Sequence, residues 1–507
     1  MGMRLFLTRH GGGLVRLAQV SALVGVAAII AGCGNNYRPV IIPVNASGPA
    51  AQPTAYLVVI SQPSPTTAGE ATIVDYSGDT IMAEVPIGLA PASFALDASG
   101  SNAYSLNSDG TITGIPVSTS VQQKQLTIST LPNGAKPLTM FATSFYLLVT
   151  DFTNNVVDIF AGSPESFRLS IPVATSPVFT TGNATGTTGR LYTTSQGFAD
   201  ATGLVCTKAP RTATATGATT PIELSNFTAD PQIAVGKCPV YGVQTPSQQR
   251  LFVLNRGDDT ITVINSQINA LDSCAPFVNQ NGQTVNCHPK LPLSLSAVTA
   301  TGVTPPNGTA GMTNIAGPVY AEYNQATSQL VVADFDGGTI SLIDCSLDEF
   351  GNDSSTFGTT YTIAVGNNPA SVTALYVGTR SYTANQTDGT VTIVNLSSHT
   401  VEKTIPVVGH PRTVVSVENS EYGKVYTVAP DSPYITIIQT ETDLIDTTVL
   451  FEGNVVDART TNQNGTSGNA IPIRRIPGYG QPCNLPPALM TSTFGANYTL
   501  ANCQAIP

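Results

Sequence analysis

Charged side chains are scarce in this sequence of 507 residues, and positive charge is the scarcer sign. Only 10% of the residues are charged, with 21 Lys and Arg against 32 Asp and Glu, and the formal net charge is −11. A protein that binds nucleic acid needs a basic surface to neutralise phosphates. The charge balance therefore argues against a nucleic-acid partner.

Histidine is nearly absent, and the cysteines lack metal-ligand spacing. The chain has four histidines, of which His288, His399 and His410 lie beyond the N-terminal segment, and it has no CxxC pair. Structural zinc and related metals are held by clustered cysteine and histidine side chains. We therefore expect no metal site of this kind and no cofactor.

The N-terminal segment has the pattern of a bacterial export signal. Three arginines give a basic start, and an apolar run over residues 17–31 is too short to span a bilayer as a mature helix. The run ends in Ala-Gly before Cys33, which resembles the bacterial lipobox. The resemblance implies a signal peptide over residues 1–32, lipidation of Cys33 and, because Gly34 stands where Asp would retain the protein in the inner membrane, an outer-membrane or cell-surface lipoprotein. An ordinary secretory signal is the alternative.

The rest of the chain has no helical period and repeats a strand–turn–strand unit. Residues 255–265 (NRGDDTITVIN), 334–344 (DFDGGTISLID) and 385–395 (NQTDGTVTIVN) are its clearest copies, and an apolar strand precedes each. Asp and Gly suit the turn because they tolerate left-handed backbone angles. The β-branched residues that follow alternate with period two, as in a strand.

A second unit, an apolar strand that ends in a small residue and then proline, follows each copy of the first. Prolines 91, 137, 177, 239, 318, 369 and 411 mark it, and the shorter spacings between them are 40 to 51 residues. Proline suits the start of a strand, where no ladder donor is lost. Each repeat thus contains four short strands, which predicts an all-β fold, a β-propeller of four-stranded antiparallel blades over residues 54–462.

The number of blades is seven or eight, and the strand count leans to eight. Three strands near residues 56–60, 71–76 and 82–87 precede the first proline, and a further strand is expected at 454–460. Joining these strands would close an eighth blade. A degenerate unit between Pro177 and Pro239 would reduce the count to seven.

These repeats resemble the YVTN-type (YncE-like) β-propeller family. The shared pattern is a strand, Asn-x-x-x-(Asp/Gly)-Thr-Val-x-Val-Ile-(Asp/Asn), and then Ile-Pro-Val-Gly-x-x-Pro; the literal Tyr-Val-Thr-Asn is replaced by residues 382–385 and 252–255. The resemblance implies a propeller fold but gives almost no information on function.

The cysteines and the long spacings locate departures from the repeat. Disulfides are expected in an exported protein, and proximity in sequence suggests Cys206–Cys238, Cys274–Cys287 and Cys483–Cys503, with Cys345 free. Insertions are expected between Asn265 and Pro318 and around residues 346–359. Residues 33–53 are expected to form a flexible tether. Residues 463–507 are expected to form an irregular tail, either closed by a disulfide between Cys483 and Cys503 or disordered.

The most promising ligand site is the mouth of the central channel. In a four-stranded blade, the turn between strands two and three and the turn into the next blade emerge on the same face, so their charged side chains should converge there. The candidates are Lys237, Arg256, Asp258, Asp334, Asp336, Asp388, His410 and Arg412. Good turn chemistry alone would also explain the aspartates.

Three functions remain open. We expect an envelope-anchored binding or scaffold propeller without catalysis, whose partner is a membrane-proximal or surface protein or a glycan. The family resemblance implies an alternative, a lactonase-like hydrolase that would use His410 and Arg412. A second alternative is a calcium-binding structural surface protein, because the paired acidic residues 258–259 and 334/336 offer oxygen ligands.

Overall fold

The protein is described from a computed structural model. It describes residues 55–64, 66–97, 99–117, 126–128, 131–132, 134–135, 137–162, 165–182, 189–198, 206, 215–279, 282–293, 315–375, 379–416 and 423–461. All of them belong to one compact unit, Pro53–Pro507. The expected signal peptide, Cys33, the tether and the cysteine pair 483–503 lie outside the described residues.

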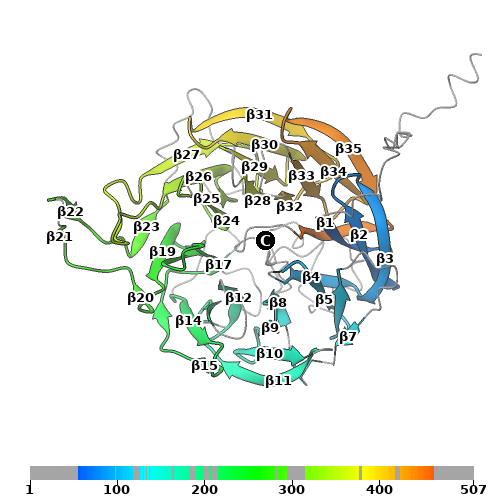
Figure 1. Ribbon diagram of the computed structural model, residues 1–507, viewed down its shortest axis with the longest axis horizontal. Coiled ribbons are helices and arrows are strands. Elements are labelled where there is room, and N and C mark those ends of the chain that lie inside the picture. Colours follow the sequence, from blue (N-terminus) through cyan, green and yellow to red (C-terminus); the bar gives the residue numbers. More distant parts are fainter. Residues whose placement is uncertain are drawn as a thin grey trace, which may run out of the picture. The chain divides into compact units, whose positions relative to one another are not determined.

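The chain forms eight antiparallel sheets arranged as a ring, so the fold is an eight-bladed β-propeller (Figure 1). Blade one combines the N-terminal strands β1 (Tyr56–Gln62), β2 (Ala68–Asp75) and β3 (Thr80–Leu89) with the last strand, β36 (Asn454–Thr460). β36 pairs with β1 from Leu57 opposite Thr460 to Gln62 opposite Asn454. The ring is therefore closed by the joining of the two ends that the strand count suggested.

Blades two to five follow in chain order. Blade two holds β4 (Pro91–Leu96), β5 (Asn102–Asn107), β6 (Ile112–Pro116) and β7 (Leu126–Ile128), and blade three holds β8 (Pro137–Ala142), β9 (Tyr146–Asp151), β10 (Val156–Gly162) and β11 (Glu165–Pro172). Blade four holds β12 (Pro177–Gly182), β13 (Arg190–Ser195), β14 (Ala218–Glu223), β15 (Thr228–Ala229) and β16 (Ile233–Ala234). Blade five holds β17 (Pro239–Gln244), β18 (Arg250–Asn255), β19 (Thr260–Asn265), β20 (Ala270–Leu271) and β23 (Lys290–Pro292). The unit after Pro177 is thus a complete blade whose fourth strand is split in two.

Blades six to eight complete the ring. Blade six holds β24 (Pro318–Asn324), β25 (Gln329–Asp334), β26 (Thr339–Asp344) and β27 (Thr360–Ala364). Blade seven holds β28 (Pro369–Ala374), β29 (Arg380–Asn385), β30 (Thr390–Asn395) and β31 (Thr400–Pro406), and blade eight holds β32 (Thr413–Ser416), β33 (Lys424–Val428), β34 (Tyr434–Gln439) and β35 (Leu444–Leu450). A separate hairpin, β21 (Phe277–Val278) with β22 (Thr284–Val285), belongs to the insertion of blade five.

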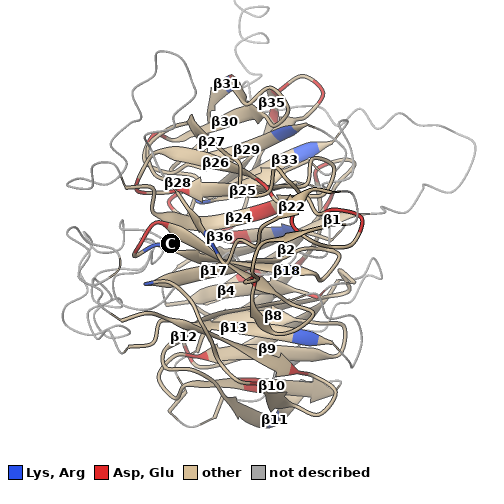
Figure 2. Cartoon of the chain, turned by 90° about the vertical axis from the view of Figure 1, so that its left-hand side faces the viewer, with Lys and Arg blue, Asp and Glu red and all other residues tan. Residues whose placement is uncertain are grey.

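The burial pattern explains why no sheet could be stable alone. Inner strands such as β18 and β28 are buried at every position, because neighbouring blades cover both faces of each sheet. The outermost strands β3 and β35 are mostly exposed. The innermost strands of the eight blades contact one another in the order β36, β4, β8, β12, β17, β24, β28, β32 and back to β36. They form a ring around the propeller axis. Charged side chains are few on the described strands (Figure 2).

The recurring asparagine and threonines form one structural motif. Asn255, at the end of β18, donates through Nδ2 to the hydroxyls of Thr260 (3.2 Å) and Thr262 (2.9 Å) at the start of β19. Asn385 makes the same pair of bonds in blade seven. A buried amide thus stabilises the turn between strands two and three. This structural role explains why the asparagine and the two threonines recur in the repeat.

Two disulfides are present among the described residues. Cys206 is bonded to Cys238 and Cys274 to Cys287, which are two of the pairs suggested by the sequence, and Cys345 is free and buried. Disulfides persist in oxidising compartments and are rare in the cytosol. The two bonds therefore indicate an exported protein.

Candidate functional site

The two sets of turns that carry the predicted site residues do lie together, and hydrogen bonds join them. The Asp388 carboxylate accepts from the backbone N–H of Asn367 (2.7 Å), and the Asp431 carboxylate accepts from that of His410 (2.9 Å). Asp109 accepts from Leu89 in the same way (3.1 Å). These aspartates hold one turn to the other, so their first role is structural.

Arg256 and Asp336 form a fully buried ion pair between blades five and six. Arg256 Nη2 lies 2.8 Å from Asp336 Oδ1, and Nε lies 3.0 Å from Oδ2, which is a two-point contact. The guanidinium also lies over the ring of Phe335, 5.2 Å from its centroid. Each charge is balanced by the other, so this pair joins the blades and offers little to a ligand.

Asp334 occupies the position that asparagine fills in other blades. Its Oδ2 accepts from the hydroxyls of Ser341 (2.6 Å) and Thr339 (3.2 Å). Burial raises the pKa of Asp334 to about 7, against hydrogen bonds that lower it. The residue is thus a fully buried carboxyl variant of the turn motif.

The other predicted residues are distributed around the ring. Asp258 pairs with Lys290 (3.0 Å), and the carbonyl of Lys237 accepts from the N–H of Gly257. His410 Nδ1 lies 2.5 Å from Asp431 Oδ2 on an exposed turn. The guanidinium of Arg412 bonds instead to β36, so His410 and Arg412 do not share one site. The expected ring of charges at the channel mouth is therefore a set of separate local pairs.

Among the predicted residues, Arg412 lies between two innermost strands of the propeller, β32 and β36. It directly precedes β32, is 2% exposed, and its Nη2 donates to the carbonyl of Val456 on β36 (3.0 Å). Burial lowers the pKa of Arg412 to about 10; the carboxylate of Asp457 opposes this shift and the charge of Arg459 adds to it. Arg412 thus lies beside two charged residues of the innermost strand of blade one.

Arg459 is the feature of this centre that the sequence patterns did not reveal. It lies on β36 with 0% exposure, and its Nη1 donates to Asp457 Oδ1 (3.0 Å) and to the carbonyl of Ala458 (2.7 Å). Nε and Nη2 of Arg459 are buried and have no hydrogen-bond partner among the described residues. Asp457 Oδ1 also accepts from Thr413 (3.1 Å), whereas its Oδ2 has no partner. A buried guanidinium with two unsatisfied donors calls for an explanation, because each unsatisfied buried donor lowers the free energy of unfolding.

Blades four to six present aromatic rings on the opposite side of the channel. Phe179, Tyr241 and Tyr320 lie on β12, β17 and β24, with consecutive ring centroids 4.4 and 4.7 Å apart. The charge of Arg459 acts on the hydroxyls of both tyrosines and lowers their pKa values, while burial, the larger effect, raises them. Blades five and six lie across the ring from blade one, so Arg459 and the two tyrosines belong to strands on different sides of the ring (Figure 1).

Glu322 completes the channel cluster, which we define as Tyr241, Tyr320, Glu322, Arg412, Asp457 and Arg459. Its Oε1 accepts from the Tyr320 hydroxyl (3.2 Å) and its Oε2 from the N–H of Ala374 (2.9 Å). Burial raises the pKa of Asp457, against the two arginines that lower it. The cluster can therefore hold an anion on Arg459, with Asp457 Oδ2 ready to accept a hydrogen bond from the same ligand.

A departure from the repeat is the signal that could have located this cluster. Two residues after the proline, the innermost strands carry Ser93, Thr139, Ser371 and Thr413 in most blades, but aromatic residues at 179, 241 and 320. In β36, Asp457 and Arg459 follow the apolar residues Val455 and Val456 and flank Ala458. Departures of this kind, each found in only some blades, mark the centre of the ring more sharply than the charged turns do.

Other classes of site are not evident in the described part of the chain. No group of three His, Cys, Asp or Glu side chains there is arranged to hold a metal ion. Nor do the described residues include a helix of the length and apolarity that a membrane crossing requires.

Comparison with known proteins places the fold. No family model and no curated protein sequence matches the chain. Apo AztD from Citrobacter koseri has a TM-score of 0.52 at 10% identity, over 80% of this chain and 97% of that chain. The dihydro-heme d1 dehydrogenase NirN, in complex with DHE, has a TM-score of 0.53 at 12% identity, over 82% and 78%. The periplasmic gluconolactonase PpgL of Pseudomonas aeruginosa has a TM-score of 0.46 at 12% identity, over 80% and 99%, too low for a functional argument. The likeness concerns the fold alone: the chain is a β-propeller.

Proposed function

We propose that this protein is an exported binding propeller whose central channel holds a small organic anion on Arg459, without catalysing a reaction. The observation that supports it most directly is the pair of unsatisfied donors, Nε and Nη2, on a fully buried guanidinium. An unsatisfied buried donor costs about 1–3 kcal/mol, and more when the group is charged. A ligand carboxylate would satisfy both donors at once.

The geometry of the guanidinium favours a carboxylate over a single-point acceptor. Nε and Nη2 lie on the same edge of the planar group and match the two oxygens of a carboxylate. The rings of Tyr241 and Tyr320 across the channel would contact the apolar part of the ligand. An aromatic carboxylate therefore fits both walls.

Benzoate and its uncharged analogue benzamide provide the test. We expect benzoate to bind the purified protein in isothermal titration and to raise its thermal midpoint, because a ligand that binds only the folded state stabilises it. Benzamide should bind at least tenfold more weakly. Equal binding of both compounds, or of neither, would contradict the proposal.

Two variants assign the binding to the channel. Arg459→Lys keeps the charge but removes the two-point donor edge, and it should weaken benzoate binding at least tenfold. Asp457→Asn with Arg459→Gln removes both charges together, so that neither is left buried alone. Arg190→Lys is the matched control, since Arg190 pairs with Glu223 in blade four, away from the channel cluster. Unchanged binding in Arg459→Lys would exclude this residue as the ligand contact.

We also propose that the protein is a YVTN-type propeller lipoprotein, anchored through Cys33 in the outer membrane or at the cell surface. The proposal rests on the Ala-Gly-Cys sequence at residues 31–33 and on the repeat pattern. Globomycin should block processing of the wild type, and Cys33→Ser should release the protein from membranes. A Cys33→Ser protein that stays membrane-bound would show that the lipid is not the anchor.

A further inference from the structure

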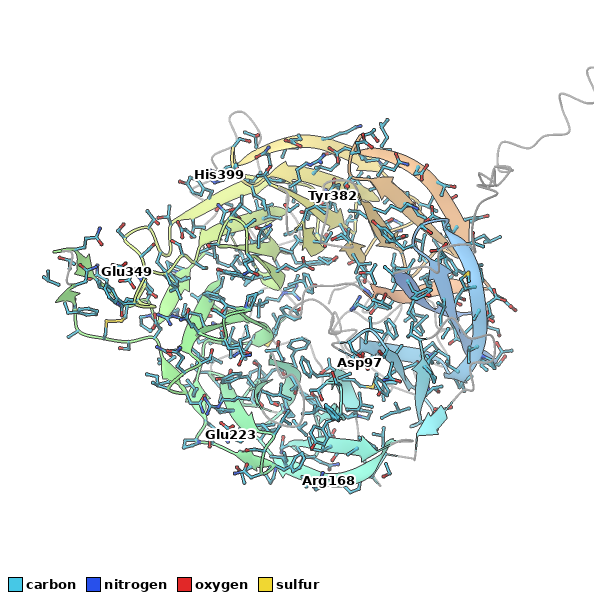
Figure 3. The ribbon with its side chains drawn as sticks, in the orientation of Figure 1. Asp97, Arg168, Glu223, Glu349, Tyr382 and His399 are labelled. Atoms are coloured by element: carbon cyan, nitrogen blue, oxygen red, sulfur yellow. A yellow bond between two sulfur atoms is a disulfide. The ribbon has the colours of Figure 1, made fainter. Side chains whose placement is uncertain are left out.

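The two insertions in the repeat meet at the rim of the ring. The β21–β22 hairpin, closed at its base by Cys274–Cys287, projects outward from blade five (Figure 1). The insertion of blade six folds as a compact loop, in which Leu347 bridges to Asp353 and Asp348 accepts from the N–H of Asn352 (2.9 Å). Gly351, Asn352 and Asp353 of this loop line the same cavity as Cys274 and Cys287. Glu349 of the loop is labelled in Figure 3. Neither insertion is needed to build a blade.

A buried polar network joins the insertions to the propeller. Arg250, on β18, donates through Nη2 to Asp353 Oδ1 (3.0 Å) and to the carbonyl of Gly351 (3.3 Å), and it lies 3.4 Å from Asp272. His288 Nδ1 lies 2.8 Å from the other oxygen of Asp353. Arg250 is 3% exposed, and its Nε has no hydrogen-bond partner within the part of the chain that the structure describes.

A cavity of about 220 Å³ opens above this network. One part of its wall is apolar and includes Ile268, Leu271 and Phe277, next to the disulfide. The polar residues of the wall are Asn265, Asn352 and the three charged residues Arg250, Asp272 and Asp353. Drug-sized ligands occupy about 300–1,000 Å³, so this cavity suits a ligand as small as one sugar ring or one amino-acid side chain.

One guanidinium and two carboxylates lie together at the cavity, so it has no excess positive charge that would attract an anion. Arg250 is bonded to Asp353, and Asp272 lies beside both. Burial raises the pKa of Asp272 to about 6, with the nearby Asp353 adding to the rise and Arg250 opposing it. At pH 7 a carboxyl with this pKa is mostly ionised, so Asp272 and Asp353 both present hydrogen-bond acceptors to the hydroxyl groups of a ligand.

We propose that this cavity binds one sugar ring of a cell-envelope glycan. Planar amide, carboxyl and guanidinium groups offer paired donors and acceptors to vicinal hydroxyls, and the free Nε of Arg250 is one such donor. Phe277 is 41% exposed at the cavity wall and offers an aromatic face to the C–H side of the ring. This site is separate from the channel cluster and does not depend on the ligand proposed there.

Ligand-observed NMR with the purified protein tests the proposal. The probes are glucose, galactose, mannose, rhamnose and N-acetylglucosamine, each added alone, and we expect saturation transfer to at least one of them. Phe277→Ala should weaken that binding about tenfold, the scale of a lost aromatic contact. Phe145→Ala, which removes an aromatic side chain that is 54% exposed in blade three, is the matched control.

Two further variants separate this site from the others. The double variant Cys274→Ser with Cys287→Ser opens the loop that forms the cavity wall and should also abolish binding, whereas Arg459→Lys should leave it unchanged. If none of the five sugars binds, or if Phe277→Ala and Phe145→Ala bind equally well, the glycan site is wrong. Loss of sugar binding in Arg459→Lys would likewise place it in the channel and overturn the proposal.

Discussion

The hydroxyl of Tyr382 in blade seven donates a 2.5 Å hydrogen bond to Asp443 in blade eight (Figure 3). Arg380 Nη1, two residues earlier on β29, lies 2.6 Å from the other oxygen of Asp443. At the next boundary, Lys424 contacts Asp79 of blade one in the same manner (2.8 Å). Asp443 and Asp79 both have positive φ in the turn between strands three and four. A basic residue at the start of strand two thus fastens each of these blades to the turn of the next.

Tyr382→Phe should destabilise the fold at this boundary. The substitution removes one buried hydrogen bond to a charged group, which is worth about 1.5–3 kcal/mol. Tyr361→Phe is the control, because Tyr361 stacks on His399 with ring centroids 3.7 Å apart and depends on the ring alone. Denaturant unfolding of both variants measures the difference, and equal midpoints would show that the Tyr382 bond adds nothing.

Asp334→Asn should stabilise the protein above pH 7. Asparagine restores the side chain found at residues 255 and 385 and can bond the same two hydroxyls. The pKa of Asp334 is raised from 3.8 to about 7, so the folded state holds this proton more tightly than the unfolded chain. The wild type therefore loses stability progressively as the pH rises from 3.8 to about 7. At pH 8 the gain should be about 2 kcal/mol.

Thermal midpoints of Asp334→Asn and wild type at pH 5 and pH 8 test this reasoning. The advantage of the variant should be larger at pH 8 than at pH 5, where the folded wild type still keeps the proton on Asp334. An advantage that is the same at both values would mean that ionisation of Asp334 is not its cause.

The four-stranded repeat could be predicted from the sequence, whereas the cluster of charged and aromatic residues at the centre of the ring could not. Alternating β-branched residues, Asp-Gly turns and regularly spaced prolines are local signals, and they indicated the blades, the closure at residues 454–460 and the two insertions. Arg459 and Tyr241 are brought together only by ring closure, which no local pattern encodes. Likewise, the pairing of Arg256 with Asp336, 80 residues away, could not be seen from turns read one at a time.

Asp272 should give the protein a second pH dependence, centred lower. Burial raises its pKa from 3.8 to about 6, so its contribution to stability is greatest at low pH and is lost as the pH rises through 6. Asp272→Asn should flatten the stability profile between pH 4 and pH 6, by about 2 kcal/mol. Asp334→Asn is the comparison, since its effect should be centred one pH unit higher; identical profiles for the two variants would refute both assignments.

Gly317→Ala should be strongly destabilising. Gly317 has a φ of 65°, and an added Cβ would lie 2.0 Å from Asp336 Oδ2, inside the buried pair with Arg256. Breaking a buried ion pair costs about 3–5 kcal/mol. Gly110→Ala is the control, with a φ of 79° and no atom within 4 Å of the new Cβ, and should cost only about 1 kcal/mol. Similar losses of stability in the two variants would show that backbone strain at positive φ, and not the clash with Asp336, destabilises Gly317→Ala.

The crystal structure of the protein in complex with benzoate tests the central claim most directly. We expect density for the carboxylate against Nε and Nη2 of Arg459, with the benzoate ring directed toward Tyr241 and Tyr320. Benzoate located only outside the channel, with both nitrogen atoms still lacking a ligand contact, would contradict the account.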